Sequence, residues 1–425
     1  MEYIIKPTDS TKEIQLAIDE VHKNGGGIVK VPAGEYIIGT IELKSNITLY
    51  LENGAILKGS DNIEDFKDIG YYHTELKKTT SVIFAKNSEN IHIDGNGVID
   101  LNGNIQYNQN EYNLIGRFID KMTEEQKKEA PWKFSRRVTQ PIFFLNCKDI
   151  TIKDITVTNG SCWTIVFVEN INVKLRGVTI KNHPNVPNND GMHFCSCKDV
   201  IISDCNIDAA DDCIAISAIT DWEKSSENFV ITNCILRSRS KALSVGYMRS
   251  IVKNVMISNC TVLESSRAFS IMSSKGDGYV ENICVTNCHF DTRIYGGDWW
   301  GNGEPIYIMG TFHNRYTEEK DRNWRVNVKN IYFTNITCTA ENAIAIVGDG
   351  HNIENVNFTN ITYTMKESKN IGIKGRVIDL APSKQIPTLP ETGDKYYFCG
   401  IDCKDVKIEN MTIHGDLVNY QRNVI

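Results

Sequence analysis

A short phrase recurs along most of the chain and limits what the chain can fold into. An Asn or Asp is followed by an apolar residue, then by any residue, and then by a second apolar residue that is usually β-branched. The phrase begins at Asn46, Asn90, Asp149, Asp199, Asn228, Asn254, Asn282, Asn330, Asn355 and Asp405. From Asp199 to Asn282 it returns after about 26 to 29 residues, which is too short for most helix-pair repeats and fits one coil of parallel strands. The sequence therefore predicts an all-β chain folded as a right-handed parallel β-helix.

Two other repeat architectures fit the phrase less well. A leucine-rich horseshoe would show a ladder of Leu, which this chain lacks. A propeller needs longer units of four antiparallel strands, and one β-branched phrase per repeat does not supply them. A solenoid also grows in one dimension, so residues 1–425 can form a single β-helix domain despite their number.

The N-terminal region, residues 1–34, is expected to cap the stack. Apolar residues recur at helical spacing between Thr11 and about Lys23, with Ser10 or Thr11 as the N-cap. Because an exposed terminal coil would invite edge pairing, we expect this helix to cover the open end of the solenoid.

Three gaps in the repeat are interpreted as loop insertions: residues 102–140, 293–325 and 366–398. The first contains a helix-like segment at 122–129. The second carries Trp299, Trp300, His313, Arg315 and Trp324, and the third carries Pro382, Pro387 and Pro390. Long loops in a regular stack often form functional walls. Two adjacent Trp could offer a surface for sugar rings, although packing beneath the loop is an equal alternative for them.

Charge and hydropathy exclude some classes of partner. The formal net charge is −7, which provides no overall field for nucleic acid or for an acidic membrane surface. No apolar stretch is long enough to span a bilayer, and the N-terminus lacks the basic start and apolar run of a signal peptide. We expect a soluble, cytoplasmic protein that binds neither nucleic acid nor membrane.

The 13 cysteines lie largely at repeat positions and not in metal-type clusters. Four of them follow an Asn or Asp in the same phrase: Cys205, Cys234, Cys260 and Cys288. Equivalent positions in stacked coils lie above one another, so we expect an inward column of small, buried, reduced thiols. The pair Cys195 and Cys197 has no matching second pair, which makes a zinc site a weak hypothesis.

Three carboxylates that lie within about one repeat are the candidate catalytic groups. They are Asp190, in the segment Asn188-Asn189-Asp190-Gly191, and the adjacent pair Asp211 and Asp212. Successive strand residues point to opposite faces, so Asp211 and Asp212 can face one cleft only across a bend. A solvated turn is the usual explanation of such a pair, but the apolar run that follows places these charges at the edge of a core. Close like charges raise one another's pKa, so one carboxyl can act as an acid while another acts as a base. This predicts a two-carboxylate hydrolysis site.

At this point the sequence resembles the polygalacturonases, glycoside hydrolase family 28. The resemblance covers most of the chain. Its motifs are Ala17-Ile18-Asp19 with Gly25-Gly26-Gly27, Pro32-Ala33-Gly34-Glu35-Tyr36, Leu51-Glu52-Asn53-Gly54-Ala55, and the two Asp-containing segments above. It implies hydrolysis of galacturonan-type chains with inversion and without a metal or other cofactor. By position, Asp211 would be the general acid, and Asp190 and Asp212 would be the pair that activates water.

Two family motifs are altered in this chain. The Gly-His-Gly motif falls on Ser240-Lys241-Ala242, so Lys241 replaces the supporting His. The Arg-Ile-Lys motif, which grips a substrate carboxylate, falls on Ser270-Ile271-Met272, so both cations are missing. The segment 297–305 is similar to a Gly-x-Trp-Trp-Gly-x-Gly-Glu-Pro loop of a divergent bacterial branch.

Other residues of the chain could replace the missing cations. Arg237, Arg239 and Lys241 alternate and would share one face of a strand. Arg267 and Lys275 bracket the altered Arg-Ile-Lys motif, and an Arg fork could hold a uronate or sulfate. His193 could contact substrate or could equally be a hydrogen-bonded core residue. The candidate substrate-binding residues are therefore Lys241, Arg239, His193, Arg267, Trp299 and Trp300.

We expect an exo-acting glycosidase that trims uronic-acid-containing, pectin-type oligosaccharides. Two alternatives remain open at this stage. One is a carbohydrate-binding β-helix that has lost turnover. The other is a β-helix polysaccharide lyase, which needs a basic residue such as Lys241 or Arg239 and usually calcium. The sequence leaves the oligomeric state open.

Overall fold

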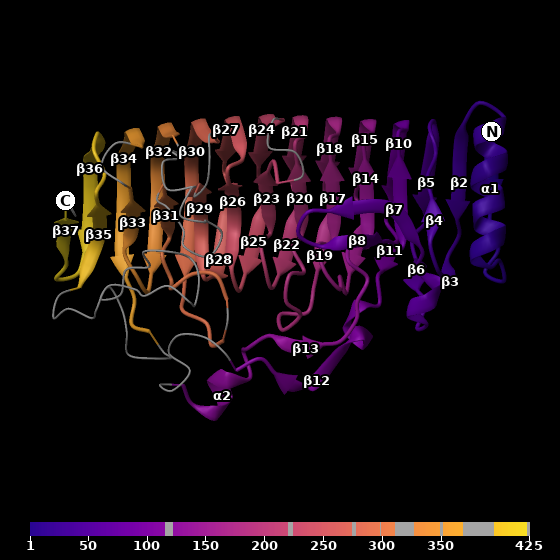
Figure 1. The fold of residues 1–425 in the computed structure, drawn as a ribbon, viewed down its shortest axis with the longest axis horizontal. Coiled ribbons are helices and arrows are strands. Elements are labelled where there is room, and N and C mark those ends of the chain that lie inside the picture. The colour runs from indigo at the N-terminus through magenta and orange to yellow at the C-terminus, as the bar shows by residue number, and fades with distance from the viewer. Residues whose placement is uncertain are drawn as a thin grey trace.

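The computed structural model describes residues 1–114, 122–219, 224–273, 278–297, 299–310, 327–348, 352–368 and 395–422. Parts of the three predicted insertions, and with them His313, Arg315, Trp324 and the three prolines, lie outside these ranges, as does Lys275. The described chain winds into one long stack of coils with α1 at one end and the last strands at the other (Figure 1). This is the predicted right-handed parallel β-helix.

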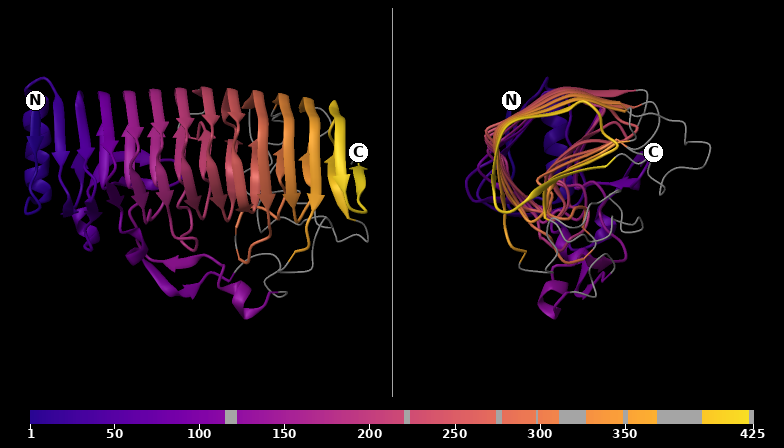
Figure 2. Two further views of the ribbon diagram at one scale, coloured as in Figure 1. Left: turned by 180° about the vertical axis from the view of Figure 1, so that it is seen from behind. Right: turned by 90° about the vertical axis from the view of Figure 1, so that its left-hand side faces the viewer.

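Two large parallel sheets form the walls of the solenoid. The 12-stranded sheet contains β4 (Ile41–Glu42), β9 (Ile83–Lys86), β14 (Ile142–Leu145), β17 (Ile165–Val168), β20 (Met192–Cys195), β23 (Ile214–Ser217), β26 (Lys241–Met248), β29 (Arg267–Ser273), β31 (Ile306–Met309), β33 (Ile344–Val347), β35 (Tyr396–Ile401) and β37 (Val418–Arg422). Seen along the axis, strands of successive coils superpose, so each coil covers the apolar interior of the next (Figure 2).

The 21-stranded sheet contributes the other faces of each coil. It contains β1 (Glu2–Ile4), β2 (Gly27–Val31), β3 (Gly34–Ile38), β5 (Ile47–Leu51), β6 (Ala55–Gly59), β10 (Glu89–Gly95), β11 (Val98–Asp100), β15 (Lys148–Lys153), β16 (Thr156–Thr158), β18 (Ile171–Arg176), β19 (Thr179–Lys181), β21 (Lys198–Ser203), β22 (Asn206–Ala209), β24 (Ser225–Thr232), β25 (Ile235–Ser238), β27 (Ile251–Ser258), β28 (Thr261–Ser265), β30 (Tyr279–Thr292), β32 (Asn327–Ala340), β34 (Ile353–Met365) and β36 (Val406–His414). Because the pairing is parallel and in register, like residues of successive coils stack above one another.

The interior is built from these stacked rows. The rings of Phe144, Phe167 and Phe194 lie nearly parallel, with centroids 5.2 and 4.8 Å apart. The thiols of Cys205, Cys234, Cys260 and Cys288 contact one another in sequence and are buried. All 13 cysteines are free thiols, so the predicted column of reduced thiols is confirmed.

The N-terminal helix also agrees with the prediction. α1 spans Thr11–Lys23 and packs across the first coil, with Ile14, Ala17, Ile18 and Val21 buried (Figure 1). Ser10 is the N-cap, and its backbone N–H donates to the Glu13 carboxylate over 2.6 Å. The helix thereby covers apolar surface at the open end of the first coil.

The Asn or Asp that begins each phrase has a conformational role. The ten residues at this position have φ between 53° and 63°, the left-handed region that Asn and Asp tolerate better than most residues. Their side chains also form a ladder along the stack. The amide of Asn282 donates to Asn254 over 3.1 Å and accepts from Asn330 over 3.0 Å. The phrase thus marks the bend at which each coil turns.

Replacing Asn282 by Ala is expected to destabilise the protein by about 1–3 kcal/mol, because Ala is strained at this φ and both ladder bonds are lost. Asn282→Gly is the matched control, since it loses the same bonds but tolerates the backbone conformation. Urea unfolding should rank the wild type above the Gly variant and the Gly variant above the Ala variant. Equal stabilities of the two variants would contradict a conformational role for Asn282.

Two excursions leave the solenoid on the side of the 12-stranded sheet. The predicted insertion 102–140 contains η2 (Gly103–Gln106), an antiparallel pair of β12 (Tyr107–Tyr112) and β13 (Trp132–Phe134), and the short helix α2 (Glu124–Lys127). A second excursion, which the sequence analysis did not separate, contains η1 (Ile63–Asp65) and a hairpin of β7 (Asp68–His73) and β8 (Lys77–Thr80). No helix among the described residues is long and apolar enough to cross a membrane.

Candidate active site

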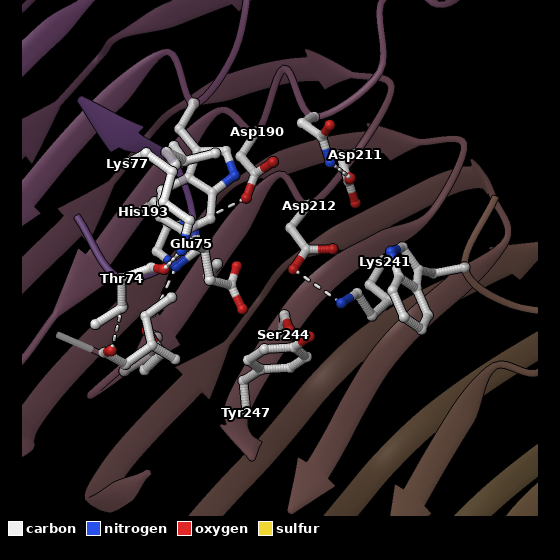
Figure 3. Close-up of a pocket in the computed structure, with 18 residues that line it drawn as sticks. Thr74, Glu75, Lys77, Asp190, His193, Asp211, Asp212, Lys241, Ser244 and Tyr247 are labelled. Carbon is white, nitrogen blue, oxygen red and sulfur yellow. Dashed lines mark hydrogen bonds and ion pairs between the residues drawn. The ribbon is translucent and has the colours of Figure 1, made fainter. Parts of the chain in front are cut away.

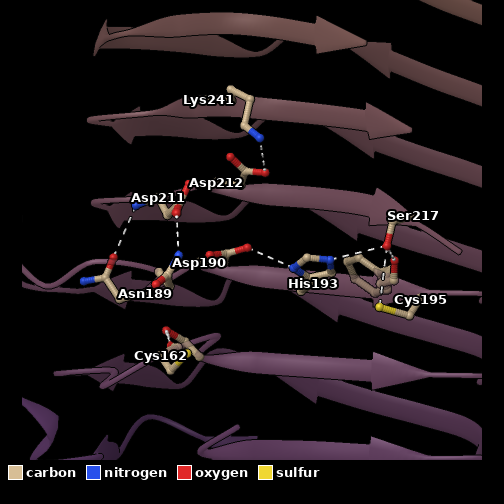
Figure 4. A network of polar contacts seen from close by, with 12 residues as sticks. Cys162, Asn189, Asp190, His193, Cys195, Asp211, Asp212, Ser217 and Lys241 are labelled. Carbon is tan, nitrogen blue, oxygen red and sulfur yellow. Dashed lines mark hydrogen bonds and ion pairs between the residues drawn. The ribbon is translucent and has the colours of Figure 1, made fainter. Parts of the chain in front are cut away.

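The parallel register of the strands brings Asp190 and Asp212 together. Met192 of β20 pairs with Ile214 of β23, and Ile214 pairs with Leu243 of β26. Asp190, Asp212 and Lys241 each lie two residues before one of these partners. They therefore hold equivalent places on three successive coils, at the entry to the 12-stranded sheet (Figure 4).

Asp211 reaches the same place because the chain bends between β22 and β23. Asn189 stabilises this bend from the neighbouring coil: its side-chain oxygen accepts from the N–H of Ala210 over 2.6 Å and from that of Asp211 over 3.4 Å. The bend allows Asp211 and Asp212, which are adjacent in sequence, to line one cleft. The predicted bend and the predicted grouping of the three carboxylates are confirmed.

A second amide orients the Asp211 carboxylate. Asn188 lies at φ 58° and donates from Nδ2 to Oδ2 of Asp211 over 3.3 Å. Its own oxygen accepts from a guanidinium nitrogen of Arg137 over 3.0 Å, which fixes the orientation of the amide. Arg137 belongs to the 102–140 insertion and also donates to the carbonyl of Pro187 over 2.8 Å. The insertion therefore supports the bend that carries Asp211 from outside the solenoid.

Asp190 and His193 form a buried pair. Nδ1 of His193 lies 2.9 Å from Oδ2 of Asp190, and the imidazole stacks on Trp163 with centroids 3.7 Å apart. Burial, reinforced by the charges of Asp211 and Asp212, raises the pKa of Asp190 well above its usual range. Burial likewise lowers the pKa of His193 well below its usual range. Both shifts favour the neutral forms, in which the protonated carboxyl donates to the imidazole.

Asp212 has a cation as its neighbour. Nζ of Lys241 lies 3.1 Å from Oδ2 of Asp212, and both side chains are nearly buried. Burial raises the pKa of Asp212 to about 7, although Lys241 acts in the opposite direction. Of the two carboxyls that stack on neighbouring coils, Asp190 and Asp212, Asp212 is thus the one whose ionised form has a compensating charge.

These groups line a cleft of about 380 Å³ on the outer face of the 12-stranded sheet (Figure 3). Thr74 and Glu75 in the turn between β7 and β8, and Lys77 at the start of β8, border one side. Lys241, Tyr247 and Trp300 border the other. The carboxylates lie between these two sides of the cleft.

Two of the predicted cations lie away from this cleft. Arg237, Arg239 and Lys241 do not share a strand, because β25 ends at Ser238 and β26 begins at Lys241. Arg237 pairs with Asp208 over 3.0 Å, and Arg239 donates to the backbone oxygen of Glu129 over 2.6 Å. Neither lines the cleft. The prediction that the three share one face of a strand is wrong, because the chain bends at residues 239 and 240, and Arg239, predicted to bind substrate, lies outside the cleft.

Arg267 and Trp299, which the sequence predicts to bind substrate, also lie outside the cleft. Arg267 is 0% exposed and donates to the carboxylate of Glu304 over 3.0 and 3.2 Å, with its guanidinium 3.6 Å from the Tyr307 ring centroid. Trp299 is 9% exposed and its indole N–H donates to the oxygen of Glu129 over 2.9 Å. Arg267 is thus held in a buried ion pair, and Trp299 is held by the 102–140 insertion. Trp300, in contrast, lines the cleft as predicted.

The sequence analysis missed the wall formed by residues 74–77. These residues lack the apolar alternation of a coil, and they lie between two copies of the phrase that were expected to follow one another in the regular stack. A signal was present, since Asn46 and Asn90, which hydrogen-bond as neighbours in the ladder, are 44 residues apart in sequence. That interval exceeds one coil and indicates an insertion. Trp163, Ser217, Ser244 and Tyr247 also line the cleft without a distinguishing sequence signal.

Among the described residues, no group of three or more His, Cys, Asp or Glu side chains is arranged to hold a metal ion. The three carboxylates have other neighbours: Asn188 for Asp211, His193 for Asp190 and Lys241 for Asp212. The geometry therefore offers acid and base chemistry by carboxyl groups at the edge of a buried pocket.

Comparison with known proteins identifies relatives of this arrangement. The family model described as glycosyl hydrolases family 28 matches residues 25–379. A "Probable polygalacturonase" of Vitis vinifera is 27% identical over 315 residues, 70% of this chain and 60% of the relative. An exo-poly-alpha-D-galacturonosidase of Dickeya chrysanthemi is 28% identical over 273 residues, 56% of this chain and 45% of the relative. The chain thus aligns with about half of the length of these curated relatives.

A solved structure shares the fold. The Yersinia enterocolitica family 28 exopolygalacturonase superposes with a TM-score of 0.70 at 19% sequence identity, covering 100% of this chain and 79% of that one. The likeness extends over the whole solenoid.

Proposed function

The chain belongs to glycosyl hydrolases family 28, and from this membership we propose that it hydrolyses glycosidic bonds in uronic-acid-containing, pectin-type oligosaccharides. The observation that carries the proposal is the grouping of Asp190, Asp211 and Asp212 on two coils within one bounded cleft. Relatives of the chain carry the names polygalacturonase and exo-poly-alpha-D-galacturonosidase, which supports a pectin-type substrate.

In the proposed mechanism, Asp211 protonates the oxygen of the leaving group. Asn188 donates to its carboxyl and keeps it directed into the cleft. Asp212, whose negative charge Lys241 compensates, accepts the proton of the attacking water. Asp190 stays protonated beside His193 and orients that water. The oxygen of water thereby bonds to the anomeric carbon as the glycosidic bond breaks, and the products are two sugars with one new reducing end.

The two walls of the cleft support an exo-acting enzyme. An enzyme that cuts within a polymer needs a groove open at both ends. Here the segment 74–77 borders one side of the carboxylates, and Trp300 and Tyr247 border the other. A short oligosaccharide end fits such a pocket better than the middle of a long chain.

We also propose that the protein acts in the cytoplasm. Its 13 free cysteines, most of them buried, suit a reducing compartment. Fractionation of the source cells, followed by immunodetection, should recover the protein with cytoplasmic markers. Recovery from the culture medium would contradict this location.

The experiment that tests the proposed function is a panel of pectin-derived oligosaccharides, assayed with and without a chelator. We expect new reducing ends, equal rates in both conditions, and a small sugar as the first product throughout the reaction. A chelator-sensitive reaction that yields an ultraviolet-absorbing unsaturated product would indicate a lyase. Binding without release of any sugar would indicate a carbohydrate-binding protein.

The pH dependence of this activity should follow the pair of Asp212 and Lys241. The base must be ionised, so kcat/KM should rise with pH through an acidic limb near pH 7. Replacing Lys241 by Met removes the charge that lowers the pKa of Asp212, and the limb should move upward by about 1 pH unit or more. Lys253→Met, which removes a half-buried partner of Glu227 away from the cleft, is the control. An unshifted limb in the Lys241 variant would exclude Asp212 as the titrating base.

A further inference from the structure

The side of the cleft that contains Lys241 differs chemically from a site for an anionic sugar. An ammonium group has three N–H donors. Nζ of Lys241 lies 3.1 Å from the Asp212 carboxylate, 5.3 Å from the Trp300 ring centroid and 3.9 Å from Sδ of Met272. The side chain is 5% exposed. Its charge is balanced by Asp212, and among the described residues the other close contacts of the ammonium group are an indole and a thioether.

Beyond Lys241 the described wall of the cleft is largely aromatic, with Ser244 as a polar residue that also lines it. Met272 and Tyr307 belong to a buried cluster on the outer face of the sheet, and Tyr247 and Trp300 are packed against it while only partly buried. The last two side chains also line the cleft. They therefore contribute aromatic surface at the point where a bound sugar would meet the wall, and such surface suits the C–H face of a sugar ring.

A carboxylate placed on this side would be poorly compensated. It would lie near Asp211 and Asp212 and next to a lysine that already has an anionic partner. Lys77 is the other lysine among the described residues that line the cleft, but it belongs to the opposite wall and its Nζ donates to the carbonyl of Thr74 over 2.8 Å. Burying a charge without an opposite charge is costly, whereas a neutral ring avoids that cost.

We propose that the sugar bound on the Lys241 side of the carboxylates is uncharged and stacks on the aromatic wall of Trp300 and Tyr247. The proposal rests on the proposed hydrolysis of uronic-acid-containing oligosaccharides and specifies their composition. The substrate class is a mixed oligosaccharide in which one sugar at the cleaved bond is neutral. A methyl-esterified uronate offers the same uncharged chemistry as a neutral hexose at this position.

The test is a matched set of disaccharides with one linkage: two galacturonates, two galactoses, and each of the two mixed orders. We expect one mixed disaccharide to have a kcat/KM at least tenfold higher than that of digalacturonate. The same disaccharide with its neutral sugar replaced by a galacturonate methyl ester carries the other kind of uncharged ring, and it should be cleaved comparably. Digalacturonate as the best substrate would overturn the proposal.

Two variants relate the preference to the aromatic wall. Trp300→Arg places a cation there and should reduce the ratio of mixed to digalacturonate cleavage at least tenfold. Trp299→Phe changes the neighbouring indole, which does not line the cleft, and should keep the ratio of the wild type. An unchanged ratio in the Trp300→Arg variant would contradict the proposal that the neutral sugar stacks on Trp300.

A binding measurement separates this proposal from the proposed function. Titration calorimetry of Asp211→Asn with the same disaccharides requires no turnover. Tighter binding of the mixed disaccharide than of digalacturonate supports the neutral site, even if the wild type hydrolyses nothing. Tighter binding of digalacturonate overturns it, even if hydrolysis is observed.

Discussion

Replacing Asp211 by Asn is expected to lower kcat/KM by about 10²–10⁴-fold, because the amide cannot supply the proton that the leaving oxygen needs. The substitution keeps the shape of the side chain. It also removes one of three neighbouring carboxyl groups, whose repulsion raises the pKa of Asp190 and of Asp212. Thermal unfolding should therefore show that the variant is at least as stable as the wild type. Loss of activity with undiminished stability is the signature of a functional residue.

Asp208→Asn is the matched control for this experiment. Asp208 lies on β22, three residues before Asp211, and forms an ion pair with Arg237 on the outer surface. Its replacement should change kcat/KM by less than about twofold, since a surface ion pair contributes at most about 1 kcal/mol to stability and lies outside the cleft. Retention of more than a tenth of the activity by Asp211→Asn would contradict the assigned acid.

Replacing Glu304 by Gln is expected to reduce the free energy of unfolding by about 3–5 kcal/mol, because the buried guanidinium of Arg267 loses its opposite charge. Glu304 is 1% exposed and accepts from two nitrogens of Arg267 and from the N–H of Asn302 over 2.7 Å. Denaturant unfolding of the wild type and the variant measures the effect. Disruption of the surface pair of Asp208 and Arg237 should cost less than about 1 kcal/mol in the same assay.

A double variant distinguishes a buried ion pair from a substrate contact. Replacing Arg267 by Met and Glu304 by Leu removes both charges, and most of the lost stability should return. If Arg267 instead gripped a substrate carboxylate, the Glu304 variant would keep its stability and the Arg267 variants would raise KM. That result would restore the sequence-based interpretation of Arg267.

The architecture could be predicted because it is repeated. Each Asn or Asp of the phrase occupies a left-handed bend, and the apolar pairs that follow pack into the interior, fully buried in every copy but the last, which is partly buried. Ten copies of one local rule determine the fold more firmly than any single segment could. The same register brings Asp190 and Asp212 together, since each lies two residues before one of two paired strand residues, Met192 and Ile214.

Whether an individual Lys or Arg faces the cleft could not be predicted, because this depends on loops that leave the repeat. Lys241 and Arg267 are register partners on neighbouring strands. Lys241 faces the cleft, whereas Arg267 is covered by the loop that carries Glu304, a residue 37 positions later in the chain. Likewise, Arg239 and Trp299 both donate to Glu129 of the 102–140 insertion. Such contacts between distant insertions have no periodic signal in the sequence.

The measurement that tests the central claim most directly is the anomeric configuration of the new reducing end, followed by NMR during cleavage of a good oligosaccharide substrate. If Asp211 protonates the leaving oxygen while Asp190 and Asp212 direct water to the opposite face, the first product has the anomeric configuration opposite to that of the cleaved bond. Mutarotation then produces the other anomer. A first product with the original configuration would contradict this mechanism, because it would require a carboxylate to attack the sugar itself.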